Sequence, residues 1–260
     1  MRVGVFGAGG RMGSAVCRAL RADPDLDLVA AVDPSHAGID LHQVTGDGEG
    51  LLVAGGAEAF QDAGVEVAVD FTRVEAARAN LAWCAEQGVH AVVGTTGFHP
   101  GDYERLAGAF TRSNCLVAPN FAIGAVLMMR MAELAAPWFE TAEIIELHHD
   151  EKADAPSGTA LRTAERLAAA SAEWGADPTR HAVLEGARGA AGPGGIRIHS
   201  VRLRGLVAHQ QVIFGTSGQV LTISHDAHDR TAFLPGVVLA CKQIASRPGL
   251  TVGLDALLGL

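Results

Sequence analysis

The chain has 260 residues, of which 48% are apolar and 19% charged, and its formal net charge is −9. This length suits one large or two modest domains, and the apolar content excludes a disordered chain. The acidic balance argues against a nucleic-acid partner, because phosphate contacts need a basic surface. No apolar run approaches the roughly 18 residues of a membrane-spanning helix, so we expect no membrane partner.

The spacing of the cysteines indicates the cellular compartment of the protein. Cys17, Cys84, Cys115 and Cys241 are scattered along the chain without CxxC spacing. This pattern predicts free buried thiols in a reducing compartment. The first residues lack the ordered charged, apolar and small-residue regions of a signal peptide. Together these features predict a cytoplasmic protein.

The first 119 residues alternate short β-branched runs with helical patterns. Strands are predicted at residues 2–6, 26–32, 65–71, 89–93 and 115–118. Helices are predicted at residues 12–22, 74–87 and 102–111. The glycine-rich residues 40–64 predict loops around a short strand near 51–53. Apolar strands that alternate with helices are typical of an α/β fold, here a Rossmann-like, doubly wound parallel sheet.

The pattern changes after Pro119, where helices no longer separate all of the strands. Helices are predicted at residues 122–139, with a break near Pro137, and at 157–171 and 231–244. Strands are predicted at 142–147, 196–203, 207–214 and 219–225, with a loop at 187–195. Three strands without intervening helices indicate an α+β domain with a mostly antiparallel or mixed sheet. We therefore expect domains at 1–119 and 120–228, and a segment 229–260 that returns to the first domain.

A glycine turn joins the first strand to the first helix. Its residues are Gly7, Ala8, Gly9, Gly10, Arg11, Met12 and Gly13. The spacing fits GxxGxxG better than GxGxxG, because Met12 holds the last position of the latter motif. Small residues let the backbone approach a pyrophosphate, and the helix start supplies amide groups and partial positive charge. The competing interpretation is a tight turn without a ligand.

Asp33 ends the second strand, twenty residues after Gly13. An acidic residue at this place can bind a ribose 2′-hydroxyl, which supports dinucleotide binding. Pro34 and Ser35 follow it, with no adjacent arginine to meet a 2′-phosphate. We therefore expect NADH to be favoured over NADPH, although Arg11 leaves dual use open.

Two further turns follow strand ends, one with Gly94, Thr95 and Thr96 and the other with Ala118, Pro119, Asn120 and Phe121. Ligands of doubly wound sheets bind outside the carboxyl ends of the strands. Hydroxyl and amide groups there suit a nicotinamide carboxamide. Ordinary loop chemistry would explain the same residues without a ligand.

Residues 146–159 carry the densest chemistry, with His148, His149, Lys152 and the run Ser157, Gly158 and Thr159. Ser157 is expected to begin a helix whose amides, with Lys152, form an anion site for one or two carboxylates. Either histidine is a natural proton donor near neutral pH. A metal site is disfavoured because consecutive strand residues point to opposite faces. The segment is also compatible with a Schiff-base lysine, or with a capped helix start that has no function.

Several stretches resemble the 4-hydroxy-tetrahydrodipicolinate reductase family, also called dihydrodipicolinate reductase. They are GAGGRMG at the start, VDFT at 69–72, VVGTTGF at 92–98, APNFAIG at 118–124, ELHH…KADAPSGTA at 146–160 and the later RLRGLVAHQQVIFG. The resemblance covers nearly the whole chain in order, and the segment 146–160 is its most specific part.

The resemblance implies NAD(P)H-dependent reduction of a cyclic imine dicarboxylate with loss of water, in lysine and diaminopimelate biosynthesis. It implies that His148 donates a proton, that Lys152 assists and binds substrate, and that His149, Ser157, Gly158 and Thr159 contact the carboxylates. It further implies that residues 7–12, Asp33, 94–96 and 118–121 contact the nucleotide. A homotetramer joined through the second domain is also implied. Asp150 and Glu151 depart from less acidic relatives, and we expect them to affect Lys152.

Two different classes of protein compete with this interpretation. A dehydrogenase of amino acids or linear imines would keep the first domain and change the substrate. An aspartate semialdehyde dehydrogenase is disfavoured, because no cysteine stands in a clear nucleophile setting. A dinucleotide-sensing regulator would need a DNA-reading module with a basic face, which the net charge of −9 disfavours.

Overall fold

The computed structural model describes residues 1–46 and 50–260. Contacts divide the chain into two compact units. Unit 1 comprises Met1–Ile123 and Arg230–Leu260, and unit 2 comprises Gly124–Asp229. The sequence-based expectation places these divisions after residues 119 and 228.

Unit 1 contains a parallel sheet. Its strands are β1 (Arg2–Phe6), β2 (Asp27–Val32), β3 (Val53–Ala54), β4 (Val67–Asp70), β5 (His90–Val93), β6 (Cys115–Val117) and β12 (Leu250–Val252). They lie in the order β12-β6-β5-β4-β1-β2-β3, and all of the paired neighbours run parallel. From β1 the chain adds β2 and β3 on one side of the sheet. It then returns to β4, next to β1, and adds β5, β6 and β12 on the other side. The β1/β4 boundary is therefore the switch point at which such sheets bind ligands.

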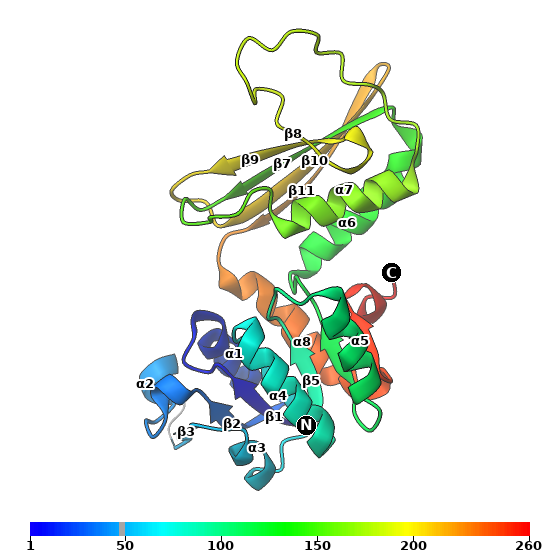
Figure 1. Ribbon diagram of the computed structural model, residues 1–260. Coiled ribbons are helices and arrows are strands. Elements are labelled where there is room, and N and C mark those ends of the chain that lie inside the picture. The colour runs from blue at the N-terminus through cyan, green and yellow to red at the C-terminus, as the bar shows by residue number, and fades with distance from the viewer. Residues whose placement is uncertain (47–49) are drawn as a thin grey trace. The chain divides into compact units, whose positions relative to one another are not determined.

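The helices of unit 1 are α1 (Arg11–Ala22), α2 (His42–Thr45), α3 (Glu58–Asp62), α4 (Val74–Gln87), α5 (Pro100–Ala109) and α8 (Leu234–Gln243). Helix α1 packs against α8, and α4 packs against α5 (Figure 1). Buried residues of α3, α4 and the sheet strands form one apolar core, which includes Phe60 and Leu81. The predicted α/β fold with a Rossmann-like parallel sheet is confirmed. Within the described ranges, none of the helices is long and apolar enough to cross a membrane.

Local sequence explains where these elements begin and end. Strand β4 is buried along its whole length, as expected for an apolar run in the interior of a parallel sheet. Helix α4 ends at Gly88, whose φ of 72° is the left-handed conformation that glycine adopts without strain. Helix α5 begins with a capping box between His99 and Asp102 and has Pro100 in its first turn.

Unit 2 contains a mixed sheet. Its strands are β7 (Thr141–His148), β8 (Ala190–Ala191), β9 (Arg197–Arg202), β10 (Ala208–Thr216) and β11 (Gln219–Ala227). They lie in the order β11-β10-β7-β9-β8, with β7 and β9 parallel and the other neighbours antiparallel. Helices α6 (Ile123–Ala135) and α7 (Gly158–Ala170) lie along one face of this sheet (Figure 1). The expectation of a mostly antiparallel or mixed sheet is confirmed.

Short elements account for most differences from the predicted boundaries. The range 40–64, predicted as loops around a short strand near 51–53, contains β3 at Val53–Ala54 and also the helices α2 and α3, and residues 47–49 lie outside the described residues. The loop predicted at 187–195 contains β8, and β12 was not predicted. Segments of two to five residues are too short to show a periodic apolar pattern. Short 3₁₀ turns occur at Pro34–His36, Ala136–Trp138, Pro193–Gly195, Arg230–Phe233, Ile244–Ser246 and Asp255–Leu257.

Candidate active site

The expected nucleotide contacts of unit 1 share one edge of the sheet. The glycine turn follows β1, Asp33 follows β2, residues 94–96 follow β5 and residues 118–121 follow β6. These strands and β4 are neighbours and run parallel, so their carboxyl ends meet at that edge. The structure therefore brings the four predicted segments to the place where doubly wound sheets bind ligands.

The glycine turn closes tightly between β1 and α1. The amide of Gly10 donates to the carbonyl of Gly7 at 3.0 Å. A Cβ atom on Gly13 would lie 1.9 Å from the carbonyl oxygen of Gly7, so a side chain does not fit there. Among the described residues, no side chain caps α1 at Gly10. The amides of its first turn are therefore available to an anion.

Asp33 lies against the glycine turn. Its Oδ2 accepts a hydrogen bond from the amide of Gly9 at 2.9 Å, and its Oδ1 accepts one from the amide of Ser35 at 2.9 Å. Nδ1 of His36 lies 3.2 Å from Asp33 Oδ1 and would lie 2.1 Å from a Cβ atom on Gly9. Glycine at position 9 thus leaves room for His36, which was not among the predicted site residues.

Asp70 organises the turn that contains Thr95. Its side chain is 1% exposed and accepts hydrogen bonds from the hydroxyls of Thr72 at 2.7 Å and Thr95 at 2.8 Å, and from the amide of Asn80 at 2.8 Å. The hydroxyl hydrogen of Thr95 is therefore engaged within the protein. Thr96 is exposed at the same turn.

Phe71 packs beside this turn. A Cβ atom on Gly94 would lie 2.0 Å from the ring of Phe71, so the ring covers the glycine closely. The rings of Phe71 and Phe121 have centroids 5.8 Å apart. Glycine at positions 9, 13 and 94 thus lets His36, the Gly7 carbonyl and Phe71 pack closely at this edge, and the free amides at the start of α1 fit the pyrophosphate of a dinucleotide.

In unit 2, the end of β7 and the start of α7 approach each other. Ser157 is the N-cap of α7, and its Oγ accepts a hydrogen bond from the amide of Ala160 at 3.2 Å, as the sequence predicts for a helix start. The amide of Ser157 donates to Glu146 at 3.1 Å. Helix α7 begins at Gly158, and the first amides of a helix have no intrahelical acceptor, so this end of α7 can meet a carboxylate.

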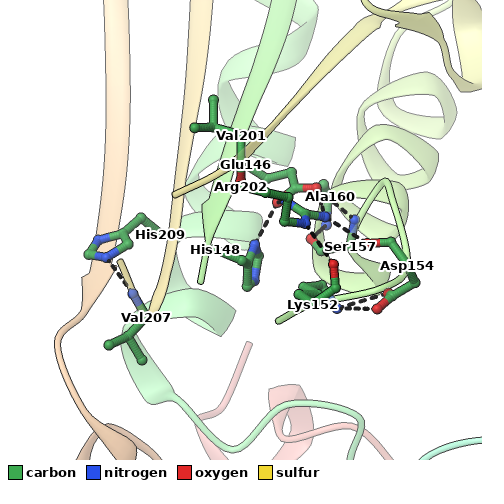
Figure 2. Close-up of polar contacts among 10 residues, drawn as sticks. All are labelled: Glu146, His148, Lys152, Asp154, Ser157, Ala160, Val201, Arg202, Val207 and His209. Carbon is green, nitrogen blue, oxygen red and sulfur yellow. Dashed lines mark hydrogen bonds and ion pairs between the residues drawn. The ribbon is translucent and has the colours of Figure 1, made fainter. Parts of the chain in front are cut away.

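His148 is held by an acidic partner (Figure 2). Its Nδ1 lies 2.5 Å from Oε2 of Glu146, and Arg202 binds both oxygens of Glu146 at 2.8 Å each. Burial raises the pKa of Glu146, but its hydrogen bonds, those from Arg202 first, outweigh burial and lower that pKa to about 2. Burial lowers the pKa of His148 and outweighs the opposing effect of Glu146. The site thus presents an ionised carboxylate beside an imidazole whose pKa lies below its ordinary value.

The acidic neighbour of Lys152 differs from the predicted ones. Nζ of Lys152 donates to both oxygens of Asp154 at 2.8 Å each. Asp150 instead pairs with Arg204 at 2.8 Å. Asp150 is therefore not the ion-pair partner of Lys152 among the described residues, and the expected effect of Asp150 and Glu151 on Lys152 stays a prediction.

The other predicted contacts surround the same turn. His149 is partly buried, and its Nδ1 has no hydrogen-bond partner within the described ranges. Its carbonyl accepts a hydrogen bond from the amide of Lys152 at 3.2 Å, which closes the turn after β7. A buried ring nitrogen without a partner in the protein is suited to pair with a ligand or a water molecule.

Sequence reasoning did not assign roles to Glu146, Arg202 or Asp70. Glu146 is flanked by Ile145 and Leu147 in a predicted strand, and an acid in such a run is a signal that it has a buried partner. Arg202 is 56 residues away from Glu146 in the sequence, and a single sequence gives no signal for that pairing.

The fold and these two sites define a class, the dinucleotide-dependent oxidoreductases. Comparison with known proteins is more specific. The family model described as dihydrodipicolinate reductase, N-terminus, matches residues 1–121, and that described as dihydrodipicolinate reductase, C-terminus, matches residues 124–258. The chain belongs to the dihydrodipicolinate reductase family.

Individual relatives agree with this assignment. The chain is 50% identical to a 4-hydroxy-tetrahydrodipicolinate reductase of Nocardia farcinica, over 100% of this chain and 99% of the relative. It is 47% identical to one of Mycobacterium marinum, over 100% of both chains. A solved structure of dipicolinate-bound dihydrodipicolinate reductase from Paenisporosarcina sp. TG-14 has a TM-score of 0.84 and 39% identity, over 98% of each chain.

Proposed function

We propose that the chain catalyses the NAD(P)H-dependent reduction of 4-hydroxy-tetrahydrodipicolinate, a cyclic imine dicarboxylate, to tetrahydrodipicolinate with loss of water. This places it in lysine and diaminopimelate biosynthesis. The observation that carries the proposal is that His148, Lys152 and the amino end of α7 meet in unit 2 of a chain with full-length relatives of that name. A dehydrogenase of linear substrates and a regulator are not favoured by these relatives.

The substrate carboxylates bind at the amino end of α7. The amides of Gly158 and Thr159 and the partial positive charge of the helix start face the dianion. The Ser157 hydroxyl, the ammonium group of Lys152 and the unsatisfied ring nitrogen of His149 complete the contacts. Lys152 must exchange Asp154 for the substrate, and an exposed ion pair of this kind is worth only about 0–1 kcal/mol.

His148 supplies the proton that the reduction needs. Elimination of the 4-hydroxyl group together with a proton of the neighbouring ring carbon, as water, would leave a conjugated imine. A nicotinamide held by unit 1 would supply the hydride for C4, and the electron pair displaced into the conjugated imine would be taken up by a proton on a ring atom. Because Nδ1 of His148 faces Glu146, the proton is transferred from Nε2. Lys152 and α7 hold the dianion in place during the transfer.

Unit 1 is the dinucleotide-binding domain in this proposal, and unit 2 is the substrate-binding and oligomerisation domain. The pyrophosphate is placed at residues 7–12, the adenosine ribose at Asp33, and the nicotinamide at residues 94–96 and 118–121. NADH is favoured, because a carboxylate at Asp33 accepts ribose hydroxyls and repels a 2′-phosphate. A Michaelis constant for NADPH at or below that for NADH would contradict this preference.

We also infer a homotetramer, formed through the sheet of unit 2, in the cytoplasm. Strand β11 at the sheet edge leaves Val220 70% exposed and Leu221 37% exposed, which supports an interface there. All four cysteines are free, as suits a reducing compartment. Light scattering after gel filtration tests the assembly, and a monomer mass would contradict it.

The identity of the product tests the proposed reaction. Reduction together with loss of water removes one oxygen atom from the substrate overall. Simple reduction of an imine, by contrast, adds two hydrogen atoms and keeps every oxygen. Mass spectrometry of the product formed from the cyclic dicarboxylate should show the loss of oxygen. A product that keeps the oxygen would contradict the proposal and favour an imine dehydrogenase.

A further inference from the structure

Glu146 and Arg202 form hydrogen bonds with other residues of the candidate site as well as with each other. The carboxylate of Glu146 is 0% exposed, and burying a charge without partners is costly. Its oxygens receive both Arg202 bonds, the amide of Ser157 at 3.1 Å and Nδ1 of His148. One buried carboxylate thus contacts both the proposed proton donor and the N-cap of the anion-binding helix.

Arg202 also forms hydrogen bonds with the turn between β7 and α7. Its Nη2 donates to the carbonyl of Asp154 at 2.7 Å, and its Nε donates to the carbonyl of Lys152 at 3.3 Å (Figure 2). The register explains how it reaches them, because Arg202 on β9 is paired with His148 on β7. Arg202 therefore fixes the backbone on both sides of the turn that carries Lys152.

We propose that Glu146 and Arg202 are positioning residues for this reaction, which orient the ring and select the tautomer of His148 and hold the Lys152 turn against α7. The inference rests on the proposed role of His148 as proton donor. Neither side chain is assigned contact with the substrate, so both act through His148 and the turn.

The tautomer follows from the charge of Glu146. An ionised carboxylate can only accept hydrogen bonds, so Nδ1 of His148 must be the donor in their 2.5 Å contact. Nε2 is then the atom that gains and loses the transferable proton, and no described residue hydrogen-bonds to it. The same carboxylate stabilises the imidazolium form, against the opposing charges of Lys152 and Arg202.

The chain offers a matched control on the same strand. Glu143 of β7 also binds an arginine and a histidine, with Arg188 on both oxygens and Nε2 of His199 at 2.7 Å. It lies three residues before Glu146, so its side chain points to the other face of the sheet. Glu143→Gln therefore removes a carboxylate charge from a similar trio outside the site, where the side chain of Glu143 is 37% exposed.

The first test compares the pH dependence of kcat for wild type, Glu146→Gln and Glu143→Gln. We expect Glu146→Gln to lower kcat about 10- to 100-fold near neutral pH, the range seen when a histidine that ligates a metal loses its outer hydrogen-bond partner. The falling limb of its profile should move to lower pH, because the imidazolium has lost its counter-charge. Glu143→Gln should keep the wild-type kcat and limb. A wild-type kcat and limb in folded Glu146→Gln would overturn the proposal.

The second test is read from the wild-type enzyme and does not depend on how Glu146→Gln folds. Nitrogen-15 NMR of histidine-labelled protein, with the His148 signal identified by its loss in His148→Gln, reports which ring nitrogen carries the proton. We expect the neutral ring to be protonated at Nδ1. Protonation at Nε2 in the neutral ring would overturn the proposal.

Failure of the positioning role can be separated from failure of the proposed function. If His148→Gln abolishes turnover and Glu146→Gln does not alter it, only the positioning role is contradicted. If His148→Gln retains wild-type turnover, the role of His148 as proton donor is contradicted, and the positioning role with it.

Discussion

Lys152 donates to both carboxylate oxygens of Asp154, at 2.8 Å each, so its charge is paired before any dicarboxylate binds. Asp154 is 65% exposed, and exposed pairs are weak in water. In the proposed function, a substrate dianion that the amides of α7 also hold would displace Asp154. The pair keeps the ammonium group at the turn without blocking the site.

Lys152→Ala should raise the Michaelis constant for the dicarboxylate and lower kcat, because it removes the cation that binds and orients the dianion. Steady-state kinetics with varied dicarboxylate measures both effects. Lys242→Ala is the control, since Lys242 also forms two carboxylate pairs but lies in unit 1, with Asp23 and Asp25. Unchanged dicarboxylate affinity in Lys152→Ala would count against this role.

His148→Gln should lower kcat by about 10²- to 10⁴-fold, the usual range for loss of a general acid. Binding of NADH should be unaffected, because His148 belongs to unit 2. Rapid mixing of the loaded enzyme with substrate measures the chemical step directly. Near wild-type turnover would refute the assignment.

The pH profile of kcat/KM should report His148 in the free enzyme. Proton donation requires the imidazolium, so activity falls as pH rises through the pKa of His148. Burial lowers that pKa below its ordinary value of about 6.5, and the falling limb should lie below this value. A falling limb at a pH well above this value, or one that persists in His148→Gln, would show that another group donates the proton.

Gly13→Ala should weaken dinucleotide binding and lower the melting temperature, because its Cβ would lie 1.9 Å from the carbonyl oxygen of Gly7. Relief of that overlap requires the glycine turn to open. Gly108→Ala is the matched control, since it is also helical and a Cβ atom there meets nothing within 4 Å. Fluorescence titration with NADH and thermal unfolding compare the two. Equal behaviour of the variants would contradict the packing argument.

Asp70→Asn should raise the Michaelis constant for NADH, because an amide cannot accept all of the hydrogen bonds from Thr72, Thr95 and Asn80. Hydrogen bonds to a charged group are worth about 1.5–3 kcal/mol each, so a lower melting temperature is expected as well. The Michaelis constant for the cyclic dicarboxylate serves as the control for unit 2. A variant with unchanged NADH kinetics would show that Asp70 does not position the turn of Thr95.

The sequence predicted the elements whose patterns are local. The range 74–87 matches α4 in full, and Ser157 caps α7 as expected. The glycine turn and Asp33 could be placed together because parallel strands end at one edge. Lys152 and His148 were proposed as site residues from their own short segment, and their roles stay predictions.

Features that depend on distant pairing were not predictable from one sequence. The partner of Glu146 is Arg202 on another strand, and the register of β7 against β9 decides that contact. Asp150 precedes Lys152 by two residues, yet it pairs with Arg204, because the fold of the turn and not sequence distance sets its direction. Strand β12 is only three residues long and pairs with β6 from far along the chain.

The most direct test of the proposed reaction is NADH oxidation, followed by the loss of its near-ultraviolet absorbance. The cyclic dicarboxylate is generated in the same solution from pyruvate and aspartate semialdehyde by the synthase that condenses them. We predict oxidation that depends on the synthase and on both of its substrates. NADH that binds tightly but is not oxidised under these conditions would contradict the proposed reaction and assign unit 2 a different imine or keto acid.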